Sequence, residues 1–269
     1  MTFAPFCRSR RPMRWAVVGA LAFMAVLVIT PPSEKAYAAN SWQKLSQAEL
    51  TVIWWQWLYS IPASQSPALD DTGANAYNGQ PYSDLLFLTG TLTSTMVGGD
   101  VLSIETRSIS VRQGIALFSP LINDEFDNVC ARPRLDCDPT VKTRPKNLGA
   151  PQLQAMAAAP IDSVTELFVT LTPTDQNFIQ NGPPVPVVPT RLPSPHPFPY
   201  KLPATDNLYQ AGGIDIEGTV APAVGDGYYS FIPLGTLQQG YYMLRFGGKV
   251  PLTGGNFILD ITYDITVTP

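Results

Sequence analysis

The segment 256–267, close to the C-terminus, constrains the fold more than any other stretch of the chain. Its apolar side chains are Phe257, Leu259, Ile261, Tyr263, Ile265 and Val267, and the residues between them are Asn256, Ile258, Asp260, Thr262, Asp264 and Thr266. A period of two is typical of a β-strand with one buried and one solvated face. The segment therefore predicts a half-buried antiparallel strand.

Two more strands are predicted directly before this one. YYSFIPL starts at residue 228 and YYMLRFGG at residue 241, and glycines at 235, 240, 247, 248, 254 and 255 bound the turns. Glycine-rich breaks between such runs favour a meander of three consecutive strands. We expect this meander to seed an all-β fold, an antiparallel β-sandwich that includes the jelly roll among its forms.

The composition agrees with a β-rich protein that has long, stiff loops. Charged residues make up 14% of the chain and 27 residues are proline, whereas an average soluble domain is roughly 25% charged. Prolines concentrate in segment 182–203, where they favour an edge strand or a polyproline segment packed along the surface. We therefore expect residues 39–269 to form a single domain.

Residues 1–38 have the three parts of a secretory signal peptide. Four arginines lie between positions 8 and 14, an apolar run covers residues 15–30, and Ala36-Tyr37-Ala38 matches a cleavage site. The alternative is an uncleaved membrane anchor, although the apolar run is shorter than the roughly 20 residues of a span. We expect a secreted or periplasmic protein with no stable membrane span after cleavage; the sequence leaves open the general and the twin-arginine export routes.

The mature chain is acidic and carries two cysteines. Removal of the leader leaves 12 basic and 20 acidic side chains, which argues against nucleic acid as a partner because nucleic acids select basic surfaces. Cys130 and Cys137 form an even pair in an oxidising compartment. They predict a disulfide bond.

One segment, residues 40–60, predicts a helix. Ser46 and Glu49 have the spacing of a capping box, and Trp54, Trp55 and Trp57 lie in the apolar run that follows. Apolar residues cover nearly the whole circumference, which predicts a buried helix. The alternative is an aromatic platform that stacks on sugars.

The rest of the chain is predicted to contain strands over 84–93, 101–111, 115–122 and 163–172 and a short helix over 150–159. Glu105, Arg107 and Arg112 are expected to point outward or toward a rim of the sheet, and residues 123–128 are expected to form a polar loop. These assignments follow from alternation and from the turn residues between the runs.

Several of these motifs together resemble a group of uncharacterised secreted bacterial proteins. The resemblance rests on WWQWLYSIP at 54–62, GIALFSPLIN at 114–123, DGYY at 226–229 and FILDITYDITV at 257–267. It implies a secreted β-rich domain and no catalytic activity. Where members of the group often have histidines before the FGG motif, this chain has YYMLR, so a metal role of those histidines is not implied here.

The acidic residues after the predicted strand 115–122 are the best candidate site. Asp124, Glu125 and Asp127 crowd carboxylates beside the predicted disulfide, and Ca²⁺ prefers such oxygen ligands. A solvated acidic loop with local ion pairs is the alternative. His196 lies between two prolines, which does not favour a catalytic triad.

These features favour a non-catalytic protein that binds a glycan or a partner surface, or that has a structural role. No catalytic residue and no cofactor other than calcium is assigned. The alternative is a carboxylate-dependent polysaccharide hydrolase, for which Glu105, Glu125, Glu166 and Glu217 are available.

The exported protein should lack residues 1–38, because the cleavage site ends at Ala38. The intact mass of the protein recovered from the periplasm or the medium measures this directly. A mass that includes residues 15–30 would indicate a membrane-anchored protein instead.

Overall fold

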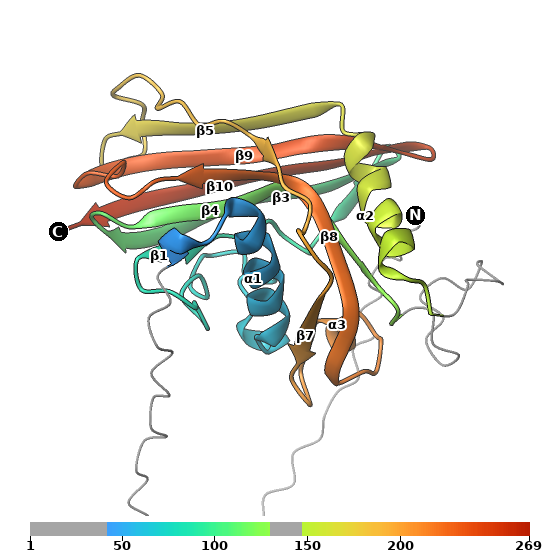
Figure 1. Cartoon of the computed structure of the whole chain (residues 1–269). Coiled ribbons are helices and arrows are strands. Elements are labelled where there is room, and N and C mark those ends of the chain that lie inside the picture. Colours follow the sequence, from blue (N-terminus) through green and yellow to red (C-terminus); the bar gives the residue numbers. More distant parts are fainter. Residues whose placement is uncertain (1–41, 130–146) are drawn as a thin grey trace, which may run out of the picture.

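The computed structural model describes residues 42–129 and 147–269, which are mostly β-structure (Figure 1). The predicted leader, Cys130 and Cys137 lie outside these residues, so the disulfide stays a prediction. In chain order the elements are η1 (Trp42–Lys44), α1 (Gln47–Ser60), η2 (Ala63–Gln65), β1 (Leu85–Phe87), β2 (Thr95–Val97), β3 (Asp100–Arg112), β4 (Ala116–Asp127), α2 (Ala150–Asp162), β5 (Glu166–Thr174), β6 (Thr190–Arg191), β7 (Phe198–Leu202), α3 (Leu208–Ala211), β8 (Gly218–Ile232), β9 (Gly240–Leu252) and β10 (Gly255–Thr268).

Two five-stranded sheets make up the fold. The first, which we call sheet A, has the order β1-β4-β8-β6, with β7 also paired to β8; the second, sheet B, has the order β2-β3-β10-β9-β5. β1 pairs with β4 and β3 pairs with β10 in parallel, while the other pairs are antiparallel. Both sheets are therefore mixed, and the prediction of a strictly antiparallel fold is wrong.

The C-terminal strand behaves as its sequence predicts, but the meander does not exist. In β10 the buried positions from Leu259 to Val267 alternate with half-buried ones. β9 and β10 form the expected hairpin, whereas β8 belongs to sheet A. The physical reason is that β8 is buried almost continuously from Ala223 to Ile232, so it needs a packed layer on each face.

Sheet A supplies those two layers because it lies between α1 and sheet B. Leu85, Phe87 and Phe118 point into a core with α1, whereas Leu86 and Leu117 point into a second core with sheet B. Figure 1 shows α1 on the side of sheet A that faces away from sheet B. The N-terminal end of β8 lies beside β7 and α3, whereas α2 packs on the middle of β8, where Leu153 and Ala157 form a small core with Val224.

The buried helix α1 confirms the sequence prediction. Ser46 accepts a hydrogen bond from the Glu49 amide, and the Glu49 carboxylate accepts one from the Ser46 amide. Trp54, Trp55 and Trp57 are at most 7% exposed. The Trp54 indole donates to the Leu88 carbonyl oxygen at 2.8 Å, so the helix is bound directly to the chain that leaves β1. Burying three indoles stabilises the fold by several kcal/mol, on the order of 2–3 kcal/mol each.

Some predicted strands differ from the structure in length. Strand β1 covers only 85–87 of the predicted 84–93, β5 begins at Glu166, and α2 extends the predicted helix to Asp162. The Leu88 amide still donates to Phe118 of β4, but the carbonyl oxygens of Leu88, Thr89 and Gly90 accept hydrogen bonds from α1 and sheet B, so the chain leaves sheet A here. The proline-rich segment contributes the short strand β6 and, at 198–202, strand β7, both paired to β8.

Close contact between β4 and β8 requires a glycine at position 227. A Cβ atom there would lie 2.5 Å from Cβ and 2.7 Å from Cα of Asn123, the residue opposite it. Neither atom can move without shifting the strand.

We expect Gly227→Ala to lower the free energy of unfolding by at least about 2 kcal/mol, because the added methyl group overpacks the pair of strands. Urea denaturation measures the change. Thr219→Ala, at an exposed position of the same strand, is the control and should change stability by less than about 0.5 kcal/mol. A Gly227→Ala variant as stable as the control would show that the two strands do not approach this closely.

Candidate functional site

A β-bulge in β4 determines where the acidic residues lie. The register with β8 shifts between Pro120 and Ile122, so that Leu121 is the extra residue. Such an extra residue moves every later side chain to the opposite face of the strand. Phe118 faces α1 before the bulge, and Asn123, Glu125 and Asp127 face the same side after it.

The predicted polar loop is therefore wrong over most of its length. Residues 123–127 continue β4 and pair with β8, including Asp124 opposite Asp226. The strand persists because Gly225 and Gly227 leave room beside it and because its polar side chains find partners on other elements.

Five side chains form what we call the acid–tyrosine cluster: Tyr59, Glu125, Asp127, Tyr200 and Tyr209. The Tyr59 hydroxyl donates to Glu125 Oε2 at 3.0 Å, and the Tyr209 hydroxyl donates to Asp127 Oδ2 at 2.8 Å. Tyr200 also donates to Asp127. The rings of Tyr59 and Tyr200 stack with a centroid distance of 4.2 Å. The cluster joins α1, β4, β7 and α3.

Only one of the two carboxyl oxygens of Glu125 takes part in a hydrogen bond. Its Oε2 accepts the bond from Tyr59, whereas Oε1 is buried and has no hydrogen-bond partner among residues 42–129 and 147–269. Burial, and next the negative charge of Asp127, raise the pKa of Glu125 well above its usual range. A neutral carboxyl group is the physical consequence, because an isolated buried charge is costly.

Asp124 lies on the other face of β4 from Glu125. Its Oδ1 accepts a hydrogen bond from the Glu125 amide at 2.9 Å, and burial raises the pKa of its carboxyl group to about 7. Asp226 on the neighbouring strand is buried as well, but it is ionically paired with Arg191 at 2.8 Å. Asp124 differs from Asp226 in that it has no cationic partner among the described residues.

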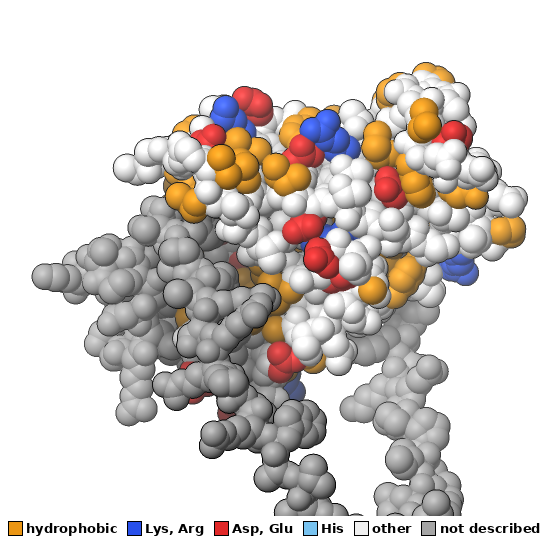
Figure 2. Space-filling model, turned by 180° about the vertical axis from the view of Figure 1, so that it is seen from behind, with side chains coloured by type: hydrophobic (Ala, Val, Ile, Leu, Met, Phe, Trp, Pro, Cys, Tyr) orange, Lys and Arg blue, Asp and Glu red, His pale blue; other side chains and the backbone are white. Residues whose placement is uncertain are grey.

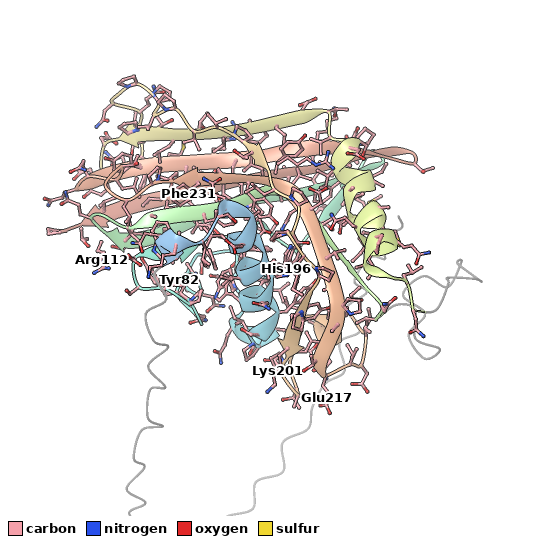
Figure 3. The ribbon with its side chains drawn as sticks, viewed as in Figure 1. Tyr82, Arg112, His196, Lys201, Glu217 and Phe231 are labelled. Carbon is pink, nitrogen blue, oxygen red and sulfur yellow. The ribbon has the colours of Figure 1, made fainter. Side chains whose placement is uncertain are left out.

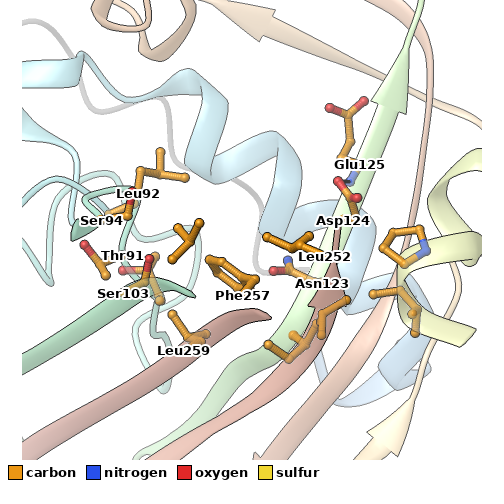
Figure 4. A pocket seen from close by; sticks show the side chains of 18 of the residues that line it. Thr91, Leu92, Ser94, Ser103, Asn123, Asp124, Glu125, Leu252, Phe257 and Leu259 are labelled. Carbon is orange, nitrogen blue, oxygen red and sulfur yellow. Dashed lines mark hydrogen bonds between the residues drawn. The ribbon is translucent and has the colours of Figure 1, made fainter. Parts of the chain in front are cut away.

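A pocket of about 540 Å³ opens beside these carboxyl groups (Figure 4). It lies along the edge of β4 beyond Phe118, where β1 no longer pairs. Asp124 and Glu125 stand at one end, Thr91, Ser94 and Ser103 at the other, and Phe257 between them. The apolar part of the lining consists mainly of Trp54, Trp55, Leu58, Tyr59, Leu92, Val101, Ile122, Ile161, Val250, Leu252, Phe257 and Leu259.

The three residues predicted to bind calcium lie close in sequence but point in different directions. Asp124 faces away from Glu125 and Asp127, and the carboxylate of Asp127 is already bound by two tyrosines. Within residues 42–129 and 147–269 no three His, Cys, Asp or Glu side chains are grouped as a metal site would require. Calcium binding stays a prediction.

The other charged candidates are dispersed. Arg107 was expected to point outward or toward a rim, but it is 1% exposed and lies between the sheets, because its guanidinium group bonds the Thr89 and Gly90 carbonyl oxygens. Glu166 pairs with Lys249 at 3.3 Å, and His196 and Glu217 are exposed on the part of the molecule formed by β7 and β8 (Figure 3).

The tyrosines of the cluster are not among the residues that the sequence predicts for the site. A signal for Tyr200 existed, because Phe198, Tyr200 and Leu202 alternate with prolyl and charged residues and all three are buried. The proline content of this segment concealed that pattern. Tyr59 was assigned to the helix, but nothing in the sequence connects it with Glu125, 66 residues later.

Comparison of the chain with protein-family models, curated proteins and solved structures finds no match. Among the described residues, the helices are too short or too polar to span a membrane. The functional proposal therefore rests on the geometry of the pocket.

Replacing Asp124 with Asn should stabilise the protein at alkaline pH and change little in acid. The ordinary pKa of this group is 3.8 and its pKa in the folded chain is about 7. Between these values the folded chain keeps a proton that the unfolded chain has lost, so stability falls as the pH rises, by at most about 4 kcal/mol.

Thermal melting of Asp124→Asn and of the wild type at about pH 4 and about pH 8 measures how the stability difference between the two proteins changes with pH. Glu217→Gln, at an exposed carboxylate, is the control and should follow the wild type at both values. An Asp124→Asn variant with the pH dependence of the wild type would show that Asp124 is ionised at little cost.

Proposed function

We propose that the protein is a secreted, non-catalytic binding protein whose pocket takes a small, mainly apolar ligand. In this proposal the two sheets form a β-sandwich that is covered by α1 on its outer face. The observation that carries the proposal is the 540 Å³ pocket at the free edge of β4, lined mainly by apolar side chains with a few polar groups at its two ends. Pockets of this size and composition are typical of small-molecule sites.

A surface platform for glycans has less support. Such a platform needs exposed aromatic rings, but Trp42, Trp54, Trp55 and Trp57 are all at most 7% exposed. On the face shown in Figure 2, apolar side chains occur in separate groups among charged and polar ones. Binding through the pocket is therefore favoured over stacking on an outer face.

A carboxylate hydrolase has one supporting feature, the raised pKa of Asp124 and Glu125. Glycosidases need two carboxyl groups that face each other across the sugar, roughly 5–10 Å apart. Asp124 and Glu125 are neighbours on one strand, and neighbouring side chains of a strand point to opposite faces. The arrangement supports binding better than hydrolysis.

Filling the pocket should abolish binding of an apolar ligand. Leu252→Trp places an indole in the pocket from the end of β9, and 1-octanol serves as the probe because it is small and uncharged. We expect isothermal titration calorimetry to detect octanol binding to the wild type and at least about a tenfold loss in Leu252→Trp.

Val188→Trp is the control, because Val188 is 74% exposed and lies outside the pocket. It adds the same side chain and should bind octanol like the wild type. Equal binding by Leu252→Trp and Val188→Trp, or no binding by the wild type, would contradict the proposed function.

A further inference from the structure

We propose that the ligand is a small organic cation, an amine or quaternary ammonium with an apolar tail, whose charged head lies against Asp124 at the end of the pocket that Glu125 also lines. The inference rests on the proposed function and assigns the chemical class of the ligand in that same pocket. It follows from three features of the pocket: the sign of the ionisable groups, an unused acceptor and the aromatic rings beside it.

Among the described residues, the ionisable side chains of the lining are Asp124, Glu125 and Tyr59, and none of the lining residues is Lys, Arg or His. Arg191, which lies near Asp124 through Asp226, is held by two carboxylates, Asp226 at 2.8 Å and Asp162 at 2.6 Å. A lining with two acids and no base favours cations over anions such as fatty acids, most of all where Asp124 is ionised.

The positive charge of Arg107 does not reverse the preference of the pocket for cations. Arg107 is fully buried and is not part of the lining, and its Nη1 is directed at the carbonyl oxygens of Thr89 and Gly90 at 3.0 Å. Its acceptors Thr89 and Gly90 both line the pocket, so the charge lies behind the part of the wall that they form. An anion held there would have to share the pocket with the two acids.

The unused acceptor is Glu125 Oε1, which is buried and without a partner. A buried polar atom of this kind costs stability unless a ligand or another group satisfies it. An ammonium group offers the charge and, in a primary amine, the N–H donors that this oxygen lacks.

Aromatic rings stand beside the two acids. Trp55 and Tyr59 both line the pocket, and their rings are stacked with a centroid distance of 5.6 Å and an angle of 19°. The face of an aromatic ring attracts a cation within about 6 Å of its centroid, and quaternary ammonium groups are bound in this way. The apolar remainder of the ligand would lie against Phe257 and Leu252.

Binding of a cation should be coupled to loss of a proton. Burial raises the pKa of Asp124 to about 7, so the acid is largely neutral below that value and must ionise to pair with a cation. The charged and titratable groups around the two acids are Tyr59, Asp127, Asp162, Arg191, Tyr200, Tyr209, Asp226 and Tyr229. Affinity for a permanent cation should therefore rise with pH through about 7.

Three probes with the same alkyl chain test the inference: octyltrimethylammonium, 1-octanol and octanoate, titrated into the full mature protein. At about pH 8.5 we expect the cation to bind at least about tenfold more tightly than octanol, and octanoate to bind more weakly than octanol. At about pH 5.5 the advantage of the cation over octanol should fall at least about threefold. The quaternary ammonium does not titrate, so any pH dependence of its binding comes from ionisable groups of the protein.

Asp124→Asn should reduce the ratio of cation to octanol affinity to about one. Glu217→Gln, which removes an exposed carboxylate of the same charge outside the pocket, should keep the ratio of the wild type. Circular dichroism of both variants establishes that they are folded.

The outcomes separate the two proposals. Octanol binding without preference for the cation, tighter binding of octanoate, or an unchanged ratio in Asp124→Asn would each overturn the inference and leave the proposed function standing. Absence of binding by all three probes would overturn both.

Discussion

The backbone from Leu88 to Gly90 is the point on which the rest of the structure depends. The Trp54 indole of α1 donates to the Leu88 carbonyl oxygen, and Arg107 of sheet B donates to the carbonyl oxygens of Thr89 and Gly90. These bonds draw the chain out of sheet A after three residues of β1, so that β1 pairs only with 116–118 of β4. The remaining edge of β4 is left beside a space between the two sheets and α1, and this space is the pocket.

The fold holds the buried Arg107 and the half-buried acids Glu125 and Asp127 apart from one another, and none of the three has an ion-pair partner among the described residues. Arg107 uses Nη1 for all its hydrogen bonds, its Nε and Nη2 have no partner, and the ring of Tyr263 lies 5.6 Å from its guanidinium carbon. On the α1 side of sheet A, Glu125 and Asp127 are held by tyrosines. Each arrangement has a desolvation cost of several kcal/mol, offset in part by charge-assisted hydrogen bonds and by the aromatic rings. Such costs are more often retained at binding sites than in inert cores.

The sequence pointed to the right acids for the candidate site but to the wrong structure around them. Asp124, Glu125 and Asp127 stand out because they are crowded, and crowded acids usually lie in solvated loops. The structure makes them part of β4, since the bulge at Leu121 and the glycines of β8 allow the strand to continue. Alternation along a strand then separates Asp124 from the other two, which no spacing rule applied to a loop would predict.

Local patterns by themselves determined the capped and buried helix, the alternating C-terminal strand and the strand over 101–111, because helix caps and side-chain periodicity act between residues close in the chain. They also determined that the protein is mostly β. Tertiary structure alone decided that β8 joins sheet A, that β3 and β10 pair in parallel, and that Arg107 is buried, because none of these contacts is local in the chain: the Arg107 partners Thr89 and Tyr263, for example, are 18 and 156 residues away. The pocket belongs to this second group: its walls come from α1, β4, α2 and the ends of β9 and β10, and only packing of these elements brings an aromatic helix against two unpaired acids.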